Sequence, residues 1–165
     1  MIRLSPVKFP SLYLNFLYGK KSMPHADIAF IDDDSMVHLG VYFPPQHVEN
    51  LNDNYIVPQS NRGLLCINIS SGKEEEIVST ICHEFRHHIQ HQHGINFKYN
   101  SNECGTWEGY ADYFLKNPQE WDALMFERSK IDSENTSILL DYIIKNNLEV
   151  KFNSEKFKKN FLSLS

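Results

Sequence analysis

The sequence predicts a single α+β domain over residues 1–165, with a small N-terminal antiparallel or mixed sheet followed by helices. Short apolar and β-branched segments bounded by turn residues lie before residue 70. Beyond that point apolar residues recur at helical spacing. The same criteria predict an additional short helix at residues 11–20 and a polar loop at residues 46–62. A chain of 165 residues that is 41% hydrophobic is long enough to bury one core.

Three segments carry the strand pattern. Residues 26–31 predict the first strand, and the aspartate-rich residues 32–35 predict a turn. The spacing of these aspartates does not match a calcium-binding loop. Residues 36–43 then predict the returning strand, which two prolines terminate. Residues 64–69 predict a third strand that leads directly into the first long helix.

That helix is predicted over residues 74–93. Three glutamates occupy its first turn, where the helix dipole favours carboxylates. Gly94 marks its end, because glycine is the usual residue after a helix C-terminus. Apolar residues at helical spacing form a stripe about 100° wide that faces a core: Val78, Ile81, Cys82, Phe85 and Ile89.

Residues 83–87 read HEFRH, an H-E-x-x-H motif on this helix. His83 and His87 lie one turn apart and nearly opposite the apolar stripe, so both imidazoles can bind one Zn²⁺. Glu84 can then take a proton from a water held by the metal. His91, one turn further on, is a poorer ligand, because three ligands on one straight helix do not easily surround a tetrahedral ion. The motif predicts a zinc-dependent hydrolase that cleaves peptide bonds.

Three further helices are predicted downstream. Thr106 and Asn117 are suitable N-cap residues, and a proline directly follows Asn117 at the first helical position. The segment 147–165 predicts a terminal strand, a helix or a frayed end. The predicted helices span residues 106–115, 118–130 and 134–146.

A catalytic zinc usually has three protein ligands, so the motif needs a third one downstream. Glu120 is one candidate, but it also fits an Asn-x-x-Glu capping box that begins at Asn117. Glu108 is the alternative, and it could equally be a surface acid in the first turn of its helix. Glu103 is a further alternative. Local sequence alone leaves this choice open.

The motif and the segment that begins at Glu120 together resemble gluzincin peptidases, of which the ImmA/IrrE-like and HtpX-like families are examples. Their third-ligand helix reads E-x-x-A-[DN]-x-F-A, and Glu120, Ala123 and Phe126 match it. The resemblance covers roughly residues 64–127 and is strongest at the motif. It implies a zincin-like fold, a Zn²⁺ held by the two motif histidines and Glu120, and a peptide or protein substrate. It also implies that a strand edge beside the motif helix binds the substrate backbone.

Leu124 departs from this pattern, which has an acid or amide at its position. We therefore expect Asp122 or Glu127 to take over the role of that acid or amide, which is to hydrogen-bond to a metal ligand. Residues 107–111 instead resemble the E-G-[FY]-A segment of aminopeptidase-type gluzincins, which keeps Glu108 as the alternative third ligand.

A peptidase also needs a hydrogen-bond donor for the oxyanion of the transition state. Tyr110, Tyr113 and His91 are candidates, although each also fits an ordinary core or surface role. The competing hypothesis is a non-catalytic binding or interaction module of zincin fold, or a protein whose metal is structural.

Composition narrows the setting of the protein. The net charge of −5 and the absence of a basic stripe argue against nucleic acid as a partner. No secretory signal and no apolar run of membrane-spanning length are present. The three cysteines are an odd number, which argues against a disulfide scaffold and favours a reducing, cytoplasmic location.

Overall fold

The structure is a computed structural model, and it describes residues 26–35, 39–45, 62–95 and 105–164 together with the backbone of four short strands nearer the N-terminus. The predicted helix at residues 11–20 lies outside the described residues. Within them the chain is α+β, as predicted, with strands first and helices after. The four short strands are β1 (Ile2–Arg3), β2 (Val7–Lys8), β5 (Asn50–Asn52) and β6 (Tyr55–Ile56).

A four-stranded mixed sheet has the order β2-β3-β7-β4. Strand β3 (Asp27–Ile31) runs parallel to β7 (Leu64–Asn68), and β4 (Gly40–Phe43) runs antiparallel to β7. The predicted hairpin between the first two strands is therefore wrong, because β7 lies between them. All five residues of β7 are buried and the first four are apolar, and such a run suits a central strand better than an edge.

The second sheet corrects another prediction. Strands β1, β6 and β5 form a three-stranded sheet, so the segment 46–62 is not entirely loop. Its two strands are only three and two residues long, and β5 reads Asn-Leu-Asn. Segments this short and polar carry no alternation that a sequence pattern can detect.

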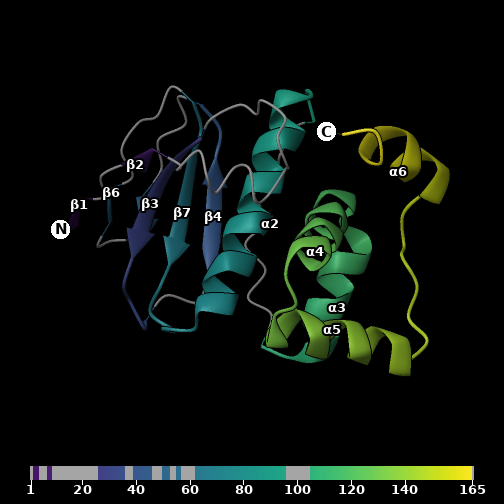
Figure 1. The fold of residues 1–165 in the computed structure, drawn as a ribbon. Helices are drawn as coiled ribbons and strands as arrows, with labels where there is room; N and C mark the ends of the chain where they lie inside the picture. Colours follow the sequence, from purple (N-terminus) through teal and green to yellow (C-terminus); the bar gives the residue numbers. More distant parts are fainter. Residues whose placement is uncertain are drawn as a thin grey trace.

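Helix α2 (Glu74–Gln92) agrees with the helix predicted at residues 74–93. Figure 1 shows it between the four-stranded sheet and the later helices. Its apolar face packs against the sheet, where Phe85 and Ile89 share a buried cluster with Leu65 and Ile67, and Val78 at the start of that face is partly buried. Its opposite face packs on helix α4 (Pro118–Lys130). Both faces of α2 are therefore buried inside the protein.

Backbone hydrogen bonds end α2 as predicted. Gly94 has a φ of +78°, and its N–H donates to the carbonyl of His91 at 3.0 Å. The next N–H, from Ile95, donates to the carbonyl of Gln90 at 3.0 Å. Together these bonds form a Schellman motif, which favours glycine at its left-handed position.

The later helices begin at the predicted residues or within one of them. They are α3 (Trp107–Lys116), α4 and α5 (Glu134–Lys145), and the segment after α5 forms α6 (Ser154–Phe161). The Thr106 side chain accepts a hydrogen bond from the Gly109 N–H, as predicted for the N-cap of α3. Helices α3, α4 and α5 share an apolar cluster on the side of α4 away from the sheet.

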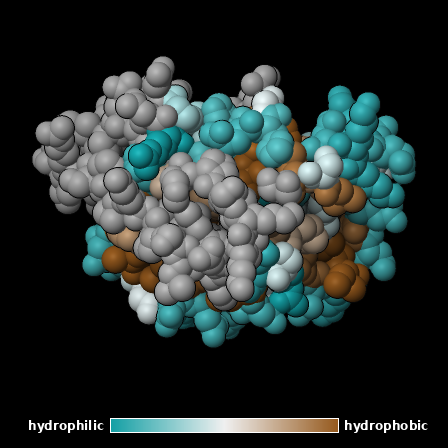
Figure 2. Space-filling view, turned by 45° about the horizontal axis from the view of Figure 1, so that its top comes forward, coloured by the Kyte–Doolittle hydropathy of each residue, from teal (hydrophilic) through white to brown (hydrophobic). Residues whose placement is uncertain are grey.

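The surface of the described residues is largely polar. Figure 2 shows hydrophilic residues over most of the coloured surface on one face, with hydrophobic residues in scattered patches. Among the described residues, no helix combines the length and apolar character needed to cross a bilayer.

Gly40 fixes how closely strand β4 approaches helix α2. A Cβ atom at this position would lie 2.5 Å from Thr80 Cγ2 and 2.9 Å from Glu84 Cγ. We expect Gly40→Ala to lower the free energy of unfolding by about 1–3 kcal/mol, because the strand and helix must separate to admit the methyl group. Urea denaturation measures this change.

Gly105 supplies the matched control, because a Cβ atom there meets nothing within 4 Å. Gly105→Ala should change the free energy of unfolding by no more than about 0.5 kcal/mol. Equal stability of the two variants would contradict the close approach of β4 to α2.

Candidate metal centre

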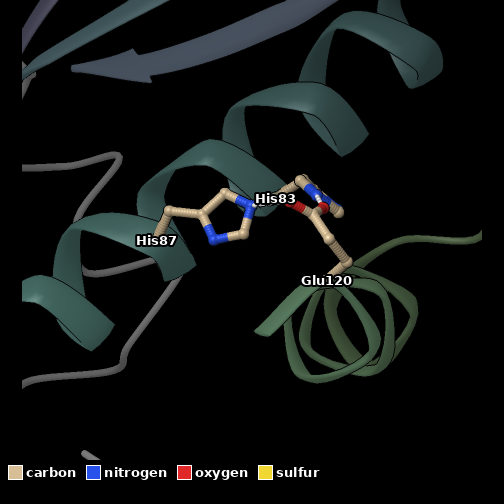
Figure 3. A group of neighbouring side chains, drawn as sticks. All are labelled: His83, His87 and Glu120. Atoms are coloured by element: carbon tan, nitrogen blue, oxygen red, sulfur yellow. Dashed lines mark hydrogen bonds and ion pairs between the residues drawn. The ribbon is translucent and has the colours of Figure 1, made fainter. Parts of the chain in front are cut away.

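His83 and His87 of α2 converge with Glu120 of α4. His83 Nε2 lies 3.0 Å from Glu120 Oε2, and His87 Nε2 lies 3.4 Å from Glu120 Oε1. Figure 3 shows both imidazoles directed toward the carboxylate from the neighbouring helix. The three potential ligand atoms lie within 4.8 Å of one another, and no other such group occurs among the residues described. The contact between α2 and α4 thus brings Glu120 next to two histidines that precede it in the sequence by at least 33 positions (120 − 87).

The start of α4 directs Glu120 toward the histidines. Asn117 is the N-cap residue, but its side chain makes no capping hydrogen bond. Its Nδ2 instead donates to the carbonyl of Tyr113 at 2.7 Å. The competing capping-box interpretation of Glu120 is therefore wrong, and its carboxylate is available to the two imidazoles.

The three side chains are almost enclosed by protein. The exposed fraction is 13% for the His83 side chain, 2% for His87 and 11% for Glu120. Burial opposes charge on each of these groups. Close opposite charges must therefore compensate if the cluster is to be stable.

The pKa shifts show this compensation. Burial alone would raise the pKa of Glu120, but the charges and hydrogen bonds of His87 and His83 hold it well below its usual value. Burial alone would lower the pKa of His83, but Glu120 and Glu127 hold it well above its usual value. The pKa of His87 is likewise raised by Glu120 against the effect of burial. The cluster is thus built to stabilise positive charge beside the Glu120 carboxylate.

Each histidine also has a partner on its outer nitrogen. His83 Nδ1 lies 3.3 Å from Glu127 Oε2, and the other oxygen of Glu127 accepts a 2.7 Å hydrogen bond from Thr136 Oγ1. His87 Nδ1 lies 2.9 Å from Gln90 Oε1. Partners of this kind fix the tautomer and orientation of metal-binding histidines.

Glu127 was among the sequence candidates, but Gln90 was not. Gln90 follows His87 by three residues on the same helix, a spacing that brings side chains into contact. That spacing was the signal that could have identified it. The aromatic ring of Phe114 was also missed, and it lies edge-on to the His83 ring at 6.0 Å between centroids.

Glu84 is buried beside the cluster, with 7% of its surface exposed. Burial raises the pKa of its carboxyl, as do Glu120 and Glu127 to a smaller extent, against the opposing effect of the two histidines. Its Oε1 would lie 3.1 Å from a Cβ atom on Gly40, so the carboxylate sits against the start of β4. No hydrogen-bond donor to it occurs among the described side chains. A carboxylate in this setting can accept and release a proton.

The remaining candidates are distributed differently. Glu108 is exposed at the start of α3 and is outside the metal cluster, and Glu103 lies outside the described residues. Tyr110 is 39% exposed, whereas Tyr113 is partly buried. The ring of His91 lies 6.3 Å from the ring of Tyr42 and is not part of the cluster.

Asp122 contacts neither histidine. Its carboxylate instead accepts hydrogen bonds from Arg86 and from Gln90, the residue that contacts His87. Leu124, which stands where the resembling families have an acid or amide, is buried among apolar residues. Gln90 thus connects Asp122 to His87 by hydrogen bonds.

Two imidazole nitrogens and one carboxylate form a donor set that suits Zn²⁺. Three protein ligands complete a catalytic type of site, in which the fourth position is left for water or substrate. The residues present therefore fit the metal that the motif implies. Comparisons of the chain with protein-family models, with curated proteins and with solved structures find no match.

We expect the protein to bind one Zn²⁺ per chain. Replacing His83, His87 or Glu120 by alanine should each weaken binding by more than about 100-fold, because each removes a ligand rather than an outer partner. Competition with a chromophoric chelator measures the affinity. Glu108→Ala is the control and should bind as the wild type does. Loss of zinc in Glu108→Ala but not in Glu120→Ala would reverse the choice of third ligand.

Proposed function

We propose that this chain is a zinc-dependent metallopeptidase whose metal is held by His83, His87 and Glu120. The observation that carries the proposal is the convergence of both Nε2 atoms and the Glu120 carboxylate within 4.8 Å. Glu84 lies on the same helix beside them. The order of sheet, motif helix and later helices supports the zincin-like fold that the resemblance implies.

Glu84 is the proton carrier of the proposed reaction. When bound, Zn²⁺ polarises the scissile carbonyl and lowers the pKa of a water. Glu84 accepts a proton from the attacking water and later gives it to the nitrogen of the leaving amine. The raised pKa of its carboxyl favours holding that proton between the two steps. His83 and His87 would hold the metal through Nε2, and their outer partners fix the orientation of both imidazoles.

Strand β4 is our candidate for the substrate-binding edge. It stands at one end of the described four-stranded sheet, and its first residue, Gly40, packs against Glu84. An extended peptide paired with this strand by β-addition would run past the Glu84 carboxylate. This geometry supports a peptide or protein substrate, and the net charge of −5 argues against a nucleic-acid substrate.

The proposed compartment is the cytoplasm. Cys66 and Cys82, the cysteines that the structure describes, are free and buried. Burial raises the pKa of both thiols to about 12, which leaves them protonated and unreactive. Free thiols fit a reducing compartment.

We expect Glu84→Gln to bind zinc as tightly as the wild type within a few-fold but to hydrolyse protein substrates at least about 100-fold more slowly. The amide keeps the shape of the side chain but cannot accept a proton from water. Cleavage of an unfolded protein such as casein, followed by gel electrophoresis and mass spectrometry, measures the rate.

Glu75→Gln is the matched control, because Glu75 is an exposed glutamate of the same helix. It should retain both zinc and activity. An active Glu84→Gln variant would exclude the proposed mechanism while leaving the metal site intact.

The second candidate is a non-catalytic module that keeps the metal for structure. The low exposure of the three ligands, 2–13% of each side chain, favours it. Under this alternative the wild-type protein binds zinc and loses thermal stability on chelation, yet cleaves no protein at any pH tested. Under the peptidase hypothesis chelation abolishes a measurable hydrolysis, and added zinc restores it.

A further inference from the structure

A series of buried hydrogen bonds leads from His87 to the C-terminal segment, defined here as residues 154–164. Its first link is the Gln90 side chain, which is 1% exposed. The Gln90 amide nitrogen donates to the carbonyl of Gln119 at 2.9 Å and to Asp122 Oδ2 at 2.8 Å. Both partners are acceptors, so the orientation of the amide is determined and its oxygen must face His87.

This orientation determines the tautomer of His87. The Gln90 oxygen can only accept a hydrogen bond, so His87 Nδ1 must carry the proton that it donates across 2.9 Å. In the neutral imidazole the lone pair is then on Nε2, the atom directed toward Glu120. Gln90 therefore leaves Nε2 as the nitrogen of His87 that can bind a metal.

The second link joins Asp122 to Arg86. The guanidinium of Arg86 binds both carboxylate oxygens of Asp122, at 2.7 and 3.1 Å. These two residues are only 7% and 5% exposed. Arg86 also lies over the ring of Phe126, 5.1 Å from its centroid. A bidentate pair of this kind fixes the direction of the carboxylate that holds Gln90.

The third link joins Arg86 to the C-terminal segment. Its Nη2 donates to the carbonyl of Phe161 at 3.2 Å, and its Nη1 donates to the carbonyl of Leu164 at 3.3 Å. Within the described part of the chain, these two bonds are the hydrogen bonds that tie the segment to other elements. Figure 1 shows the end of the chain beside α2.

We propose that docking of the C-terminal segment and binding of metal at His87 stabilise each other through Arg86, Asp122 and Gln90. The inference rests on the proposed metal site but not on peptidase activity. Without the two carbonyls, Arg86 and Asp122 can turn as a pair, and the Gln90 amide then keeps only its bond to the Gln119 carbonyl. The orientation of Gln90, and with it the hydrogen bond to His87 Nδ1, is then less firmly fixed. Because coupling between two binding events is reciprocal, metal at His87 strengthens docking of the segment by the same factor.

A separate route from the other histidine provides an internal reference. His83 contacts Glu127, and Glu127 accepts a hydrogen bond from Thr136 in the first turn of α5. This route shares no side chain with the route through Gln90. A substitution at Gln90 should therefore remove the effect of metal on the C-terminal segment and leave its effect on α5 unchanged.

The test combines zinc affinity with amide hydrogen exchange on the full chain. In the wild type, zinc should slow the exchange of amides in residues 157–164. In Gln90→Met, zinc should bind about 10-fold more weakly, the loss typical of an outer partner. Zinc at saturation should no longer slow exchange in residues 157–164, whereas it should still slow exchange in α5. Without zinc, exchange in the segment should match the wild type, because Arg86 and Asp122 remain.

Gln92→Met is the matched control, because Gln92 is an exposed glutamine of the same helix. It should behave as the wild type in every measurement. Arg86→Met is less informative, because it leaves the Asp122 carboxylate buried without its cation and so destabilises the fold by itself.

Four outcomes decide the matter. Loss of the zinc response in residues 157–164 of Gln90→Met, with α5 still responding, supports the coupling. If the wild-type protein binds zinc but exchange in residues 157–164 does not slow, the coupling is overturned and the metal site stands. This outcome does not depend on whether Gln90→Met folds. An unchanged zinc response in Gln90→Met also overturns it. Failure of the wild type to bind zinc overturns the metal site itself, and with it both proposals.

Discussion

The burial of α2 on two opposite faces is the constraint on which the rest of the structure depends. Phe85 and Ile89 pack on the sheet. His83 and His87 lie on the opposite side of the helix and face α4. A helix with apolar residues on both faces would satisfy this burial without further conditions. A helix with two histidines on its second face requires partners for both, because unpaired polar groups inside protein are costly. Glu120 and Glu127 of α4 and Gln90 of α2 itself supply those partners.

Charge balance explains why these partners converge on the histidines. Glu84, Glu120 and Glu127 are all nearly buried, with 7%, 9% and 6% of the surface of each whole residue exposed. Three buried negative charges so close together would oppose folding unless positive charge lies among them. The raised pKa values of the two imidazoles provide that charge in the metal-free protein. A divalent cation provides it more completely, which is a physical reason for this arrangement to favour metal.

The sequence predicted the positions of the candidate site residues better than the order of the strands, for reasons that particular residues make clear. The positions of His83, Glu84 and His87 follow from helical geometry alone, and Asn117 and Pro118 determine where the helix of Glu120 begins. Strand order is different, because pairing of β7 between β3 and β4 depends on segments more than twenty residues apart. Local alternation at residues 26–43 suggested a hairpin and contained no information about the insertion of β7.

The choice between Glu120 and Glu108 also lay beyond local sequence. Both glutamates occupy the first turn of a helix, and both match a segment of some gluzincin family. What separates them is tertiary: α4 packs directly along α2, whereas Glu108 is exposed at the start of α3. Gln90 was overlooked for the opposite reason. Its spacing from His87 was readable, but an amide three residues from a histidine gains meaning only when Asp122 and Gln119 fix its orientation.

The two outer partners differ in charge, and this difference bears on how the site functions. Glu127 places a second carboxylate next to His83, whereas Gln90 presents a neutral amide to His87. A carboxylate at position 90 would add a fourth negative charge to the cluster, next to the carboxylate of Asp122. The amide instead donates to Asp122 and accepts from His87, so it orients the imidazole without adding charge. Arg86 then neutralises Asp122, and the carbonyls of Phe161 and Leu164 accept hydrogen bonds from two of its three remaining N–H groups. This series of hydrogen bonds thereby connects His87 to the C-terminal segment.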